Sequence, residues 1–208
     1  MKNLITIGLP SKGRLKEKAV SFFDNRGLKV LQSKKERNYF ATIENKPNIK
    51  IIYLHAKEII QRLGDGTLDL GISGLDLLNE SEKNLQNKIR IKQKLDFGEA
   101  NLVVAVPDDW IDVQTVADLE EVAFDIRLKR NERLRVATKY PNLTNNFLIS
   151  KGVTQYKLIS SLGATETYPF IGSSEIITDI TSTGKTLEDN NLRVLKDGLI
   201  LRSTACLF

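Results

Sequence analysis

The sequence predicts an α/β protein of two lobes. Short apolar runs typical of strands alternate with helical patterns along the whole chain, which is the mark of α/β architecture. Two long strand-like runs, near residues 90–95 and 193–200, lie far apart in the sequence, and we expect them to carry the chain out of one lobe and back. The chain contains no linker, low-complexity tract or obvious repeat. These observations predict two lobes joined by a double crossing, with a cleft between them.

Strand and helix patterns fill the first half of the chain. Apolar runs predict strands at residues 4–8, 39–43, 49–54 and 68–72, the middle two around a turn at 45–48. Apolar residues at helical spacing predict helices at 14–26, 56–63 and 75–79, and Gly27 stops the first of them. Residues 89–95 roughly alternate apolar and polar side chains, so we expect a long half-buried strand there, followed by another at 102–106.

The second half continues in the same way. Helical patterns occupy residues 113–128, 141–150 and 165–171, and the second of these has Pro141 in its first turn, where a helix makes no use of the missing N–H. Strand patterns occupy residues 134–137, 156–159 and 176–180, and a final long strand is expected at 193–201.

The composition is that of a soluble globular chain in a reducing, cytoplasmic setting. Of 208 residues, 41% are hydrophobic and 27% charged, so the chain can bury a sizeable core. No apolar run approaches the roughly 18 residues of a membrane helix, and the N-terminus has no signal-peptide layout. With one cysteine, Cys206, and one histidine, His55, we expect no disulfide framework and no metal site built from several such ligands.

The net charge of +5 suits either nucleic acid or small anions such as polyphosphates. The basic residues are dispersed, and the densest cluster is SKKER at 33–37. No RNA-recognition or helix-turn-helix pattern is present. We therefore expect no nucleic-acid partner and interpret most of that cluster as a solvated charged surface.

The stretch TSTGKTL at residues 181–187 contains the Gly-Lys-Thr that ends a nucleotide-binding P-loop. A P-loop needs a glycine five residues before Gly184, and Asp179 occupies that position, so the P-loop interpretation fails. The hydroxyls around Gly184 instead predict a tight loop that holds a phosphate monoester, with Asp179 accepting hydrogen bonds from sugar hydroxyls. That arrangement suits a ribose 5-phosphate. A capped helix start after a strand explains the same residues equally well.

Two earlier segments also join a strand to a helix. In GLPSKGRL, residues 8–15, Lys12 and Arg14 suit a pyrophosphate or triphosphate, although both also fit a solvated loop. In DLGISGLDLL, residues 69–78, Gly71 and Gly74 permit the close approach of a ligand, although they also fit plain turn formers.

Four segments together resemble the ATP phosphoribosyltransferase family, which catalyses the first step of histidine biosynthesis. They are GLPSKGRL, DLGISGLDLL, RVATKYPNLT at 135–144, and ETYPFIGSSEIITDITSTGKTL at 166–187. The last segment is the most specific, because it fixes Glu166, Gly172, Asp179 and the run [ST]-G-x-T-L over 22 residues. The resemblance runs in order over nearly the full chain. It implies two lobes of periplasmic-binding-protein-like (type II) fold with the active site in the cleft between them: residues 1–92 with 188–208, and residues 93–187.

The resemblance also implies a reaction and its site. A ring nitrogen of the adenine of ATP attacks the anomeric carbon of phosphoribosyl pyrophosphate and expels pyrophosphate, with Mg²⁺ present. Positioning and electrostatics dominate such chemistry, so we expect no obligate general base. By position, Glu166 and Asp179 contact the ribose or its metal. The 5-phosphate is assigned to Ser182, Thr183, Gly184, Lys185 and Thr186, and the pyrophosphate or ATP phosphates to Lys12, Arg14 and Arg37.

The chain departs from the family pattern at His55, where many members have an arginine in a Leu-Arg-Ala context. A neutral imidazole cannot replace a bidentate guanidinium. His55 therefore has two interpretations, a polar residue at a strand end or a catalytic residue. Because the sequence ends at Phe208, we expect no regulatory lobe of the kind that longer members carry. It resembles the short form, which implies a separate regulatory subunit similar to histidyl-tRNA synthetase, and a homodimer within a larger hetero-oligomer.

Two other functions fit parts of the sequence. A non-catalytic two-lobe protein that binds a small anion shares the fold, but the complete ribose-phosphate segment and the missing export signal argue against it. A phosphoribosyltransferase of the purine-salvage type has a similar loop. Those enzymes usually have two adjacent acids before the loop, where Thr178-Asp179 supplies one.

Overall fold

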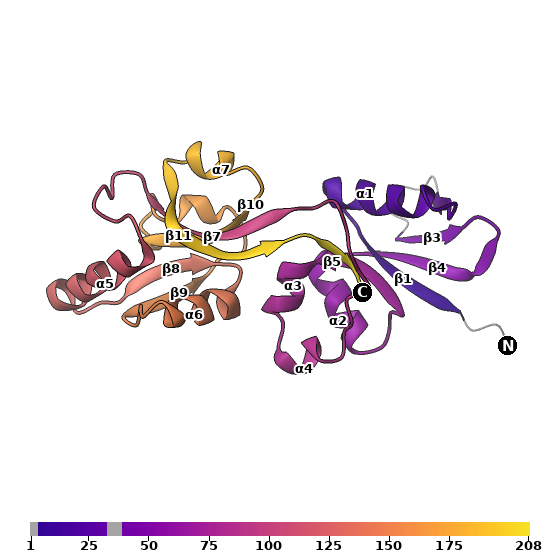
Figure 1. The fold of residues 1–208 in the computed structure, drawn as a ribbon, viewed down its shortest axis with the longest axis horizontal. Helices are drawn as coiled ribbons and strands as arrows, with labels where there is room; N and C mark the ends of the chain where they lie inside the picture. The colour runs from indigo at the N-terminus through magenta and orange to yellow at the C-terminus, as the bar shows by residue number, and fades with distance from the viewer. Residues whose placement is uncertain (1–3, 33–38) are drawn as a thin grey trace. The chain divides into compact units, whose positions relative to one another are not determined.

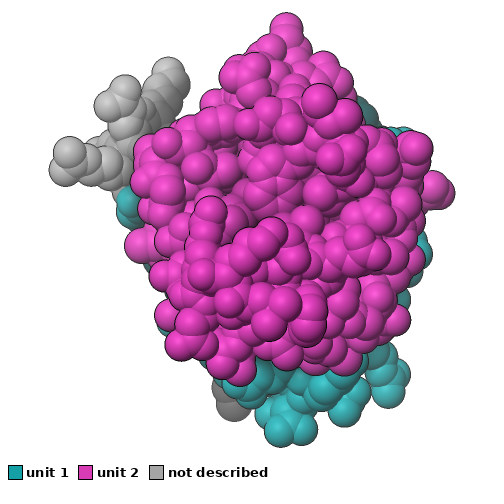
Figure 2. All heavy atoms as spheres, turned by 90° about the vertical axis from the view of Figure 1, so that its left-hand side faces the viewer, with its two compact units in different colours: residues 1–99, 203–208 teal, residues 100–202 magenta. Residues whose placement is uncertain are grey.

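The computed structural model describes residues 4–32 and 39–208 and divides into two compact units (Figure 2). Unit 1 comprises residues 1–99 and 203–208, and unit 2 comprises residues 100–202. Both units are α/β, which confirms the predicted fold class. Their bounds differ from those expected from the sequence: residues 93–99 belong to unit 1, and residues 188–202 belong to unit 2, because the long final strand joins the sheet of unit 2.

Unit 1 is a mixed sheet with helices on both faces. The strand order is β2-β3-β4-β1-β5-β12-β6, with β1 parallel to both β4 and β5. Figure 1 shows α1 on one face of this sheet and α2 and α3 on the other. The elements are β1 (Ile5–Pro10), α1 (Gly13–Asp24), β2 (Val30–Gln32), β3 (Phe40–Ile43), β4 (Lys46–Leu54), α2 (Ala56–Gly64), β5 (Leu70–Gly74), α3 (Leu75–Glu80), α4 (Lys83–Gln86), β6 (Gln93–Lys94) and β12 (Ala205–Leu207).

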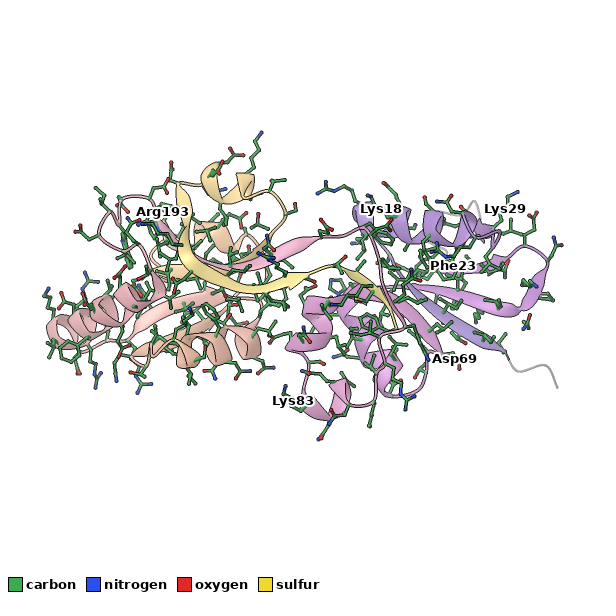
Figure 3. All side chains as sticks on the ribbon, viewed as in Figure 1. Lys18, Phe23, Lys29, Asp69, Lys83 and Arg193 are labelled. Atoms are coloured by element: carbon green, nitrogen blue, oxygen red, sulfur yellow. The ribbon has the colours of Figure 1, made fainter. Side chains whose placement is uncertain are left out.

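Each face of the unit 1 sheet has its own core. Phe22 and Phe23 of α1 pack with Ile7 and Ile51 on one face, and Figure 3 labels Phe23 between the helix and the strands. On the other face, a Cβ at Gly71 would lie 2.6 Å from Cγ2 of Ile59, so the glycine lets α2 pack directly on β5. Gly71 therefore serves helix–sheet packing rather than a ligand.

Unit 2 is a second mixed sheet, in the order β11-β7-β10-β8-β9. Strands β8 and β9 run parallel to β10, and β7 runs antiparallel to it. Alternate residues of β7 enter opposite cores: Val104 and Val106 pack with α5 and α6, while Val103 and Ala105 pack with α7. The elements are β7 (Ala100–Pro107), α5 (Val116–Arg130), β8 (Leu134–Thr138), α6 (Pro141–Ser150), β9 (Tyr156–Ser160), the 3₁₀ turn η1 (Thr165–Thr167), β10 (Ile176–Thr181), α7 (Lys185–Glu188) and β11 (Leu192–Ser203).

Three predicted elements need correction. The long strand expected at 89–95 is reduced to β6, because its partner β12 is only three residues long. The helix expected at 165–171 is a 3₁₀ turn, because Pro169 has no N–H to donate to the carbonyl of Thr165. The final strand extends to Ser203, and a separate strand, β12, follows it in the sheet of unit 1.

Candidate functional site

The predicted ribose-phosphate residues lie at one edge of the unit 2 sheet. Because β8, β9 and β10 are parallel, their carboxyl ends share this edge, where ligands of open α/β sheets usually bind. Asp179 lies near the end of β10, Lys139 follows β8, and Ser161 follows β9. Ser161 is tied to the neighbouring strand, because its N–H donates to the carbonyl of Thr138 at 2.9 Å.

Asp179 is a largely buried carboxylate with one cation beside it. Its side chain is 13% exposed, and Nζ of Lys139 lies 3.9 Å from Oδ1. Burial raises the pKa of the Asp179 carboxyl above its usual value, and the charge of Glu166 adds to this effect. The N–H of Ile180, the amine of Lys139 and the hydroxyl of Thr165 act in the opposite direction. A carboxylate in this setting is a strong acceptor for hydroxyls that displace water.

Glu166 approaches Asp179 from η1. This turn is anchored by a buried hydroxyl pair, Ser161 Oγ and Thr165 Oγ1, 2.8 Å apart. Glu166 itself is half-buried, and its charge acts on Asp179. The charge of Glu166 thus acts on Asp179, although the two acids are 13 positions apart in the chain.

The loop after β10 is a tight turn with exposed hydroxyls. Thr181 Oγ1 accepts the N–H of Gly184 at 2.8 Å, and Gly184 has a φ of +81°, a left-handed conformation that favours glycine. Thr183 Oγ1 accepts the N–H of Lys185 at 3.4 Å. The side chains of the loop that lie exposed at this edge are Ser182, Thr183, Lys185 and Thr186.

Unit 1 has a corresponding edge at the carboxyl ends of β1, β4 and β5. Lys12 and Arg14 follow β1 and are exposed, and the N–H of Ser11 donates to the carbonyl of Leu54 at 2.9 Å. This bond holds the loop after β1 beside His55, which follows β4. Arg37, the third predicted cation, lies outside the described residues.

His55 caps helix α2. Its Nδ1 accepts the N–H of Lys57 at 3.3 Å, which leaves Nε2 as the ring nitrogen that can donate. The imidazole is exposed, and its Nε2–H is free to donate from this edge. Gly74, which sequence analysis considered near a ligand, begins α3, and a Cβ there would lie 2.3 Å from Oδ1 of Asp76.

Lys139 is the site residue that sequence analysis missed. It lies within RVATKYPNLT, where a lysine after a short strand has the pattern of any solvated loop residue. Its position is evident only from the parallel pairing of β8 with β10.

No group of three or more acidic, histidine or cysteine side chains that could hold a metal occurs among residues 4–32 and 39–208. The same part of the chain has no helix long and apolar enough to cross a membrane.

Comparisons with known proteins find similar sequences along nearly the whole chain. Residues 55–208 match the family model described as HisG: ATP phosphoribosyltransferase. The chain is 48% identical over 204 residues to an ATP phosphoribosyltransferase of Brucella melitensis biotype 2, an alignment that covers 98% of this chain and 88% of the relative. The corresponding protein of Brucella suis gives the same values.

Solved structures show the same relationship and the wider fold. An ATP phosphoribosyl transferase (HisG:HisZ) complex from Thermotoga maritima matches with a TM-score of 0.71 and 25% identity, covering 98% of this chain and 86% of that chain. An extracellular-binding protein of an amino-acid ABC transporter from Bacillus subtilis matches with a TM-score of 0.56 and 12% identity, covering 99% and 83%. At that identity the second match shows the fold alone, which is periplasmic-binding-protein-like.

Proposed function

Because this chain belongs to the HisG family of ATP phosphoribosyltransferases, we propose that the carboxyl edge of β8, β9 and β10 binds its phosphoribosyl pyrophosphate. The chain is a transferase that moves the phosphoribosyl group of this substrate to ATP, the first step of histidine biosynthesis. The observation that supports this location best is the largely buried Asp179, followed directly by the hydroxyl-rich turn at Gly184.

Each side chain of this edge has a proposed role. Asp179 and Glu166 accept hydrogen bonds from the ribose hydroxyls, since two carboxylates offer acceptors and no donors. The 5-phosphate lies against the loop after β10, which comprises Ser182, Thr183, Gly184, Lys185 and Thr186, and it accepts hydrogen bonds from the exposed hydroxyls and the amine of this loop. Lys139 adds positive charge beside Asp179.

Unit 1 supplies the cations for polyphosphate. Lys12 and Arg14 are exposed at the same edge as His55, and we assign them, with Arg37, to the phosphates of ATP or the leaving pyrophosphate. The adenine ring nitrogen attacks the anomeric carbon without first losing a proton. Catalysis therefore comes from the alignment of two polyanions and from neutralisation of the leaving group's charge. None of these residues acts as an obligate base.

Mg²⁺ fits this site as a companion of the substrates. Asp179 feels the charge of a second carboxylate, Glu166, and Mg²⁺ is commonly held by one or two carboxylates together with substrate phosphates. Bound there, the ion would neutralise charge on the pyrophosphate.

The assembly we propose is a homodimer within a larger complex that includes a HisZ-like regulatory subunit similar to histidyl-tRNA synthetase, in the cytoplasm. The support is the structural match to the HisG:HisZ complex from Thermotoga maritima. The alternative of a non-catalytic small-anion-binding protein is not favoured, because the relatives at 48% identity are named as transferases, whereas the binding proteins share the fold alone.

The site assignment is tested with Asp179→Asn, which keeps the side chain's shape and removes its charge. Losing a charge-assisted hydrogen bond to the sugar costs about 1.5–3 kcal/mol, that is about tenfold to a hundredfold in affinity. Calorimetric titration with phosphoribosyl pyrophosphate and Mg²⁺ measures the affinity, and initial rates measure the Michaelis constants. Asp125→Asn, on the exposed side of α5, is the matched control. Wild-type binding and turnover in Asp179→Asn would show that the substrate lies elsewhere.

A further inference from the structure

Three threonine hydroxyls form a closed ring inside unit 2. Oγ1 of Thr138 lies 3.1 Å from that of Thr144 and 2.6 Å from that of Thr178, and the last two are 2.7 Å apart. The residues come from β8, α6 and β10, and their exposed fractions are 1%, 0% and 0%. Thr138 and Thr178 are direct neighbours across the two parallel strands.

The direction of each hydrogen bond in the ring is fixed. Thr178 donates its hydroxyl hydrogen to Thr138, so in its contact with Thr144 it accepts. Thr144 has thereby used its hydrogen, so Thr138 is the donor in the remaining contact. The hydrogens run in one sense round the ring, and every hydroxyl donates once and accepts at least once.

The ring also fixes the chain on either side of it. Thr138 Oγ1 accepts the N–H of Tyr140 at 2.9 Å, which sets the turn that contains Lys139 and starts α6. On the strand β10, Thr178 directly precedes Asp179. Because side chains alternate along a strand, Asp179 points to the face of the sheet opposite Thr178, and Nζ of Lys139 lies 3.9 Å from its Oδ1. The ring therefore holds β8, β10 and α6 together behind the Lys139–Asp179 pair.

We propose that this ring is a positioning device that sets Lys139 and Asp179 in the geometry that binds phosphoribosyl pyrophosphate. The inference rests on the proposed function of this edge. Packing alone does not require three hydroxyls, because apolar side chains of the same shape fill such space without needing partners. Hydrogen bonds add direction, and a closed ring gives the three elements one mutual arrangement.

Thr144→Val tests the proposal without touching either strand of the site. Valine keeps the volume but breaks the ring, leaving the hydroxyl of Thr138 without its acceptor. We expect the dissociation constant and the Michaelis constant for phosphoribosyl pyrophosphate to rise about tenfold or more, since small displacements at a reacting site are costly. The Michaelis constant for ATP is expected to change little, and Thr144→Ser, which retains the hydroxyl, to restore wild-type values.

Leu148→Ala is the matched control, because Leu148 is fully buried on the same helix one turn further from the ring. It lowers the melting temperature but is expected to leave the affinity of the folded protein for phosphoribosyl pyrophosphate unchanged. If Thr144→Val does not fold, Thr144→Cys replaces it, because a thiol is a much weaker hydrogen-bonding group of similar size.

The proposal is wrong if Thr144→Val, or Thr144→Cys where it is used instead, binds with wild-type affinity. It is also wrong if Leu148→Ala loses as much affinity as Thr144→Val, or if Thr144→Ser does not restore binding. Asp179→Asn, measured in parallel, shows whether a negative result concerns the threonine ring alone or the proposed substrate site as well. If Asp179→Asn weakens binding and Thr144→Val does not, the ring has no positioning role while the proposed site stands. If neither variant weakens binding, the proposed site is wrong as well.

Discussion

Nζ of Lys139 lies 3.9 Å from Oδ1 of Asp179, although the two residues are 40 positions apart in the chain. That distance is longer than a hydrogen bond, so the pair is held by charge alone and each group keeps hydrogen-bonding capacity for a ligand. About a third of the Lys139 side chain is exposed, against 13% for Asp179. The lysine can therefore follow a substrate, whereas the aspartate is fixed in place.

Replacing Lys139 by methionine is expected to weaken binding of phosphoribosyl pyrophosphate and to change its pH dependence. The amine of Lys139 lowers the pKa of Asp179, so its removal raises that pKa further. Binding that needs the ionised carboxylate then falls off at a higher pH than in the wild type. Affinity measured by calorimetry across a pH series checks this, and identical profiles for both proteins would contradict it.

Asp179→Asn is expected to make the folded protein more stable at neutral pH while it weakens substrate binding. Burial holds the pKa of Asp179 above its unfolded value of 3.8, so the protonated form favours folding, and that contribution is lost as the pH rises through the folded pKa. Asparagine resembles the protonated form at every pH. The gain over the wild type is thus greatest at neutral pH and disappears as the pH falls towards 3.8. Urea midpoints at several pH values measure it; a less stable variant at pH 7 would refute the argument.

Lys12→Ala and Arg14→Ala are expected to lower activity without affecting the fold. Both side chains are exposed at the edge of unit 1, so each substitution changes stability by about 0.5 kcal/mol or less. Loss of a cation that neutralises phosphate is expected to reduce kcat/KM by about tenfold or more. Lys18→Ala, on an exposed position of α1, serves as the control (Figure 3). A large drop in melting temperature with normal turnover would make these residues structural.

Gly184→Ala tests the turn after β10. The nearest atom to an added Cβ is Oε1 of Glu188 at 3.9 Å, so the substitution meets no steric obstacle. Its cost comes from the left-handed backbone and amounts to about 1–2 kcal/mol. Gly184→Asn is expected to cost less, since asparagine tolerates this conformation. Both can be compared by urea unfolding, and equal losses would show that backbone strain is not the cause.

Two substitutions with different chemistry show whether His55 is a helix cap or a substrate-binding residue. His55→Ala removes the cap of α2 and is expected to cost about 1 kcal/mol, whereas His55→Asn preserves the cap. Normal kcat/KM for ATP in His55→Asn would establish that the histidine is a structural cap. A loss in both variants would instead assign its Nε2–H to substrate binding.

Much of the architecture was predictable because local patterns and tertiary packing agree. The alternation of strands and helices predicted both sheets, and Asp179 with its following turn lies where the motif placed it, at a strand end. Errors arose where a segment depends on a distant partner. Residues 89–95 alternate like a strand, yet the pairing extends only as far as the three-residue partner allows.

The candidate site was predictable one segment at a time. Asp179 and Gly184 belong to one continuous motif, so the sequence alone could assign them. The role of Lys139 and the threonine ring depend on the parallel register of β8 and β10, which places Thr138 beside Thr178. No local pattern specifies that register, and so neither feature could be read from the chain.

Strand β12 has a consequence for the order in which the chain folds as it is made. It lies between β5 and β6, so residues 205–207 complete the sheet that residues 5–10 begin. Unit 2 is contiguous from 100 to 202 and can fold on the ribosome before synthesis ends. Unit 1 cannot complete its sheet until β12 emerges, because one edge of β5 stays unpaired until then. A chain stalled shortly before residue 205 would therefore have a folded unit 2 and a unit 1 whose sheet still exposes an unpaired strand edge. Such intermediates are bound by chaperones and degraded by proteases.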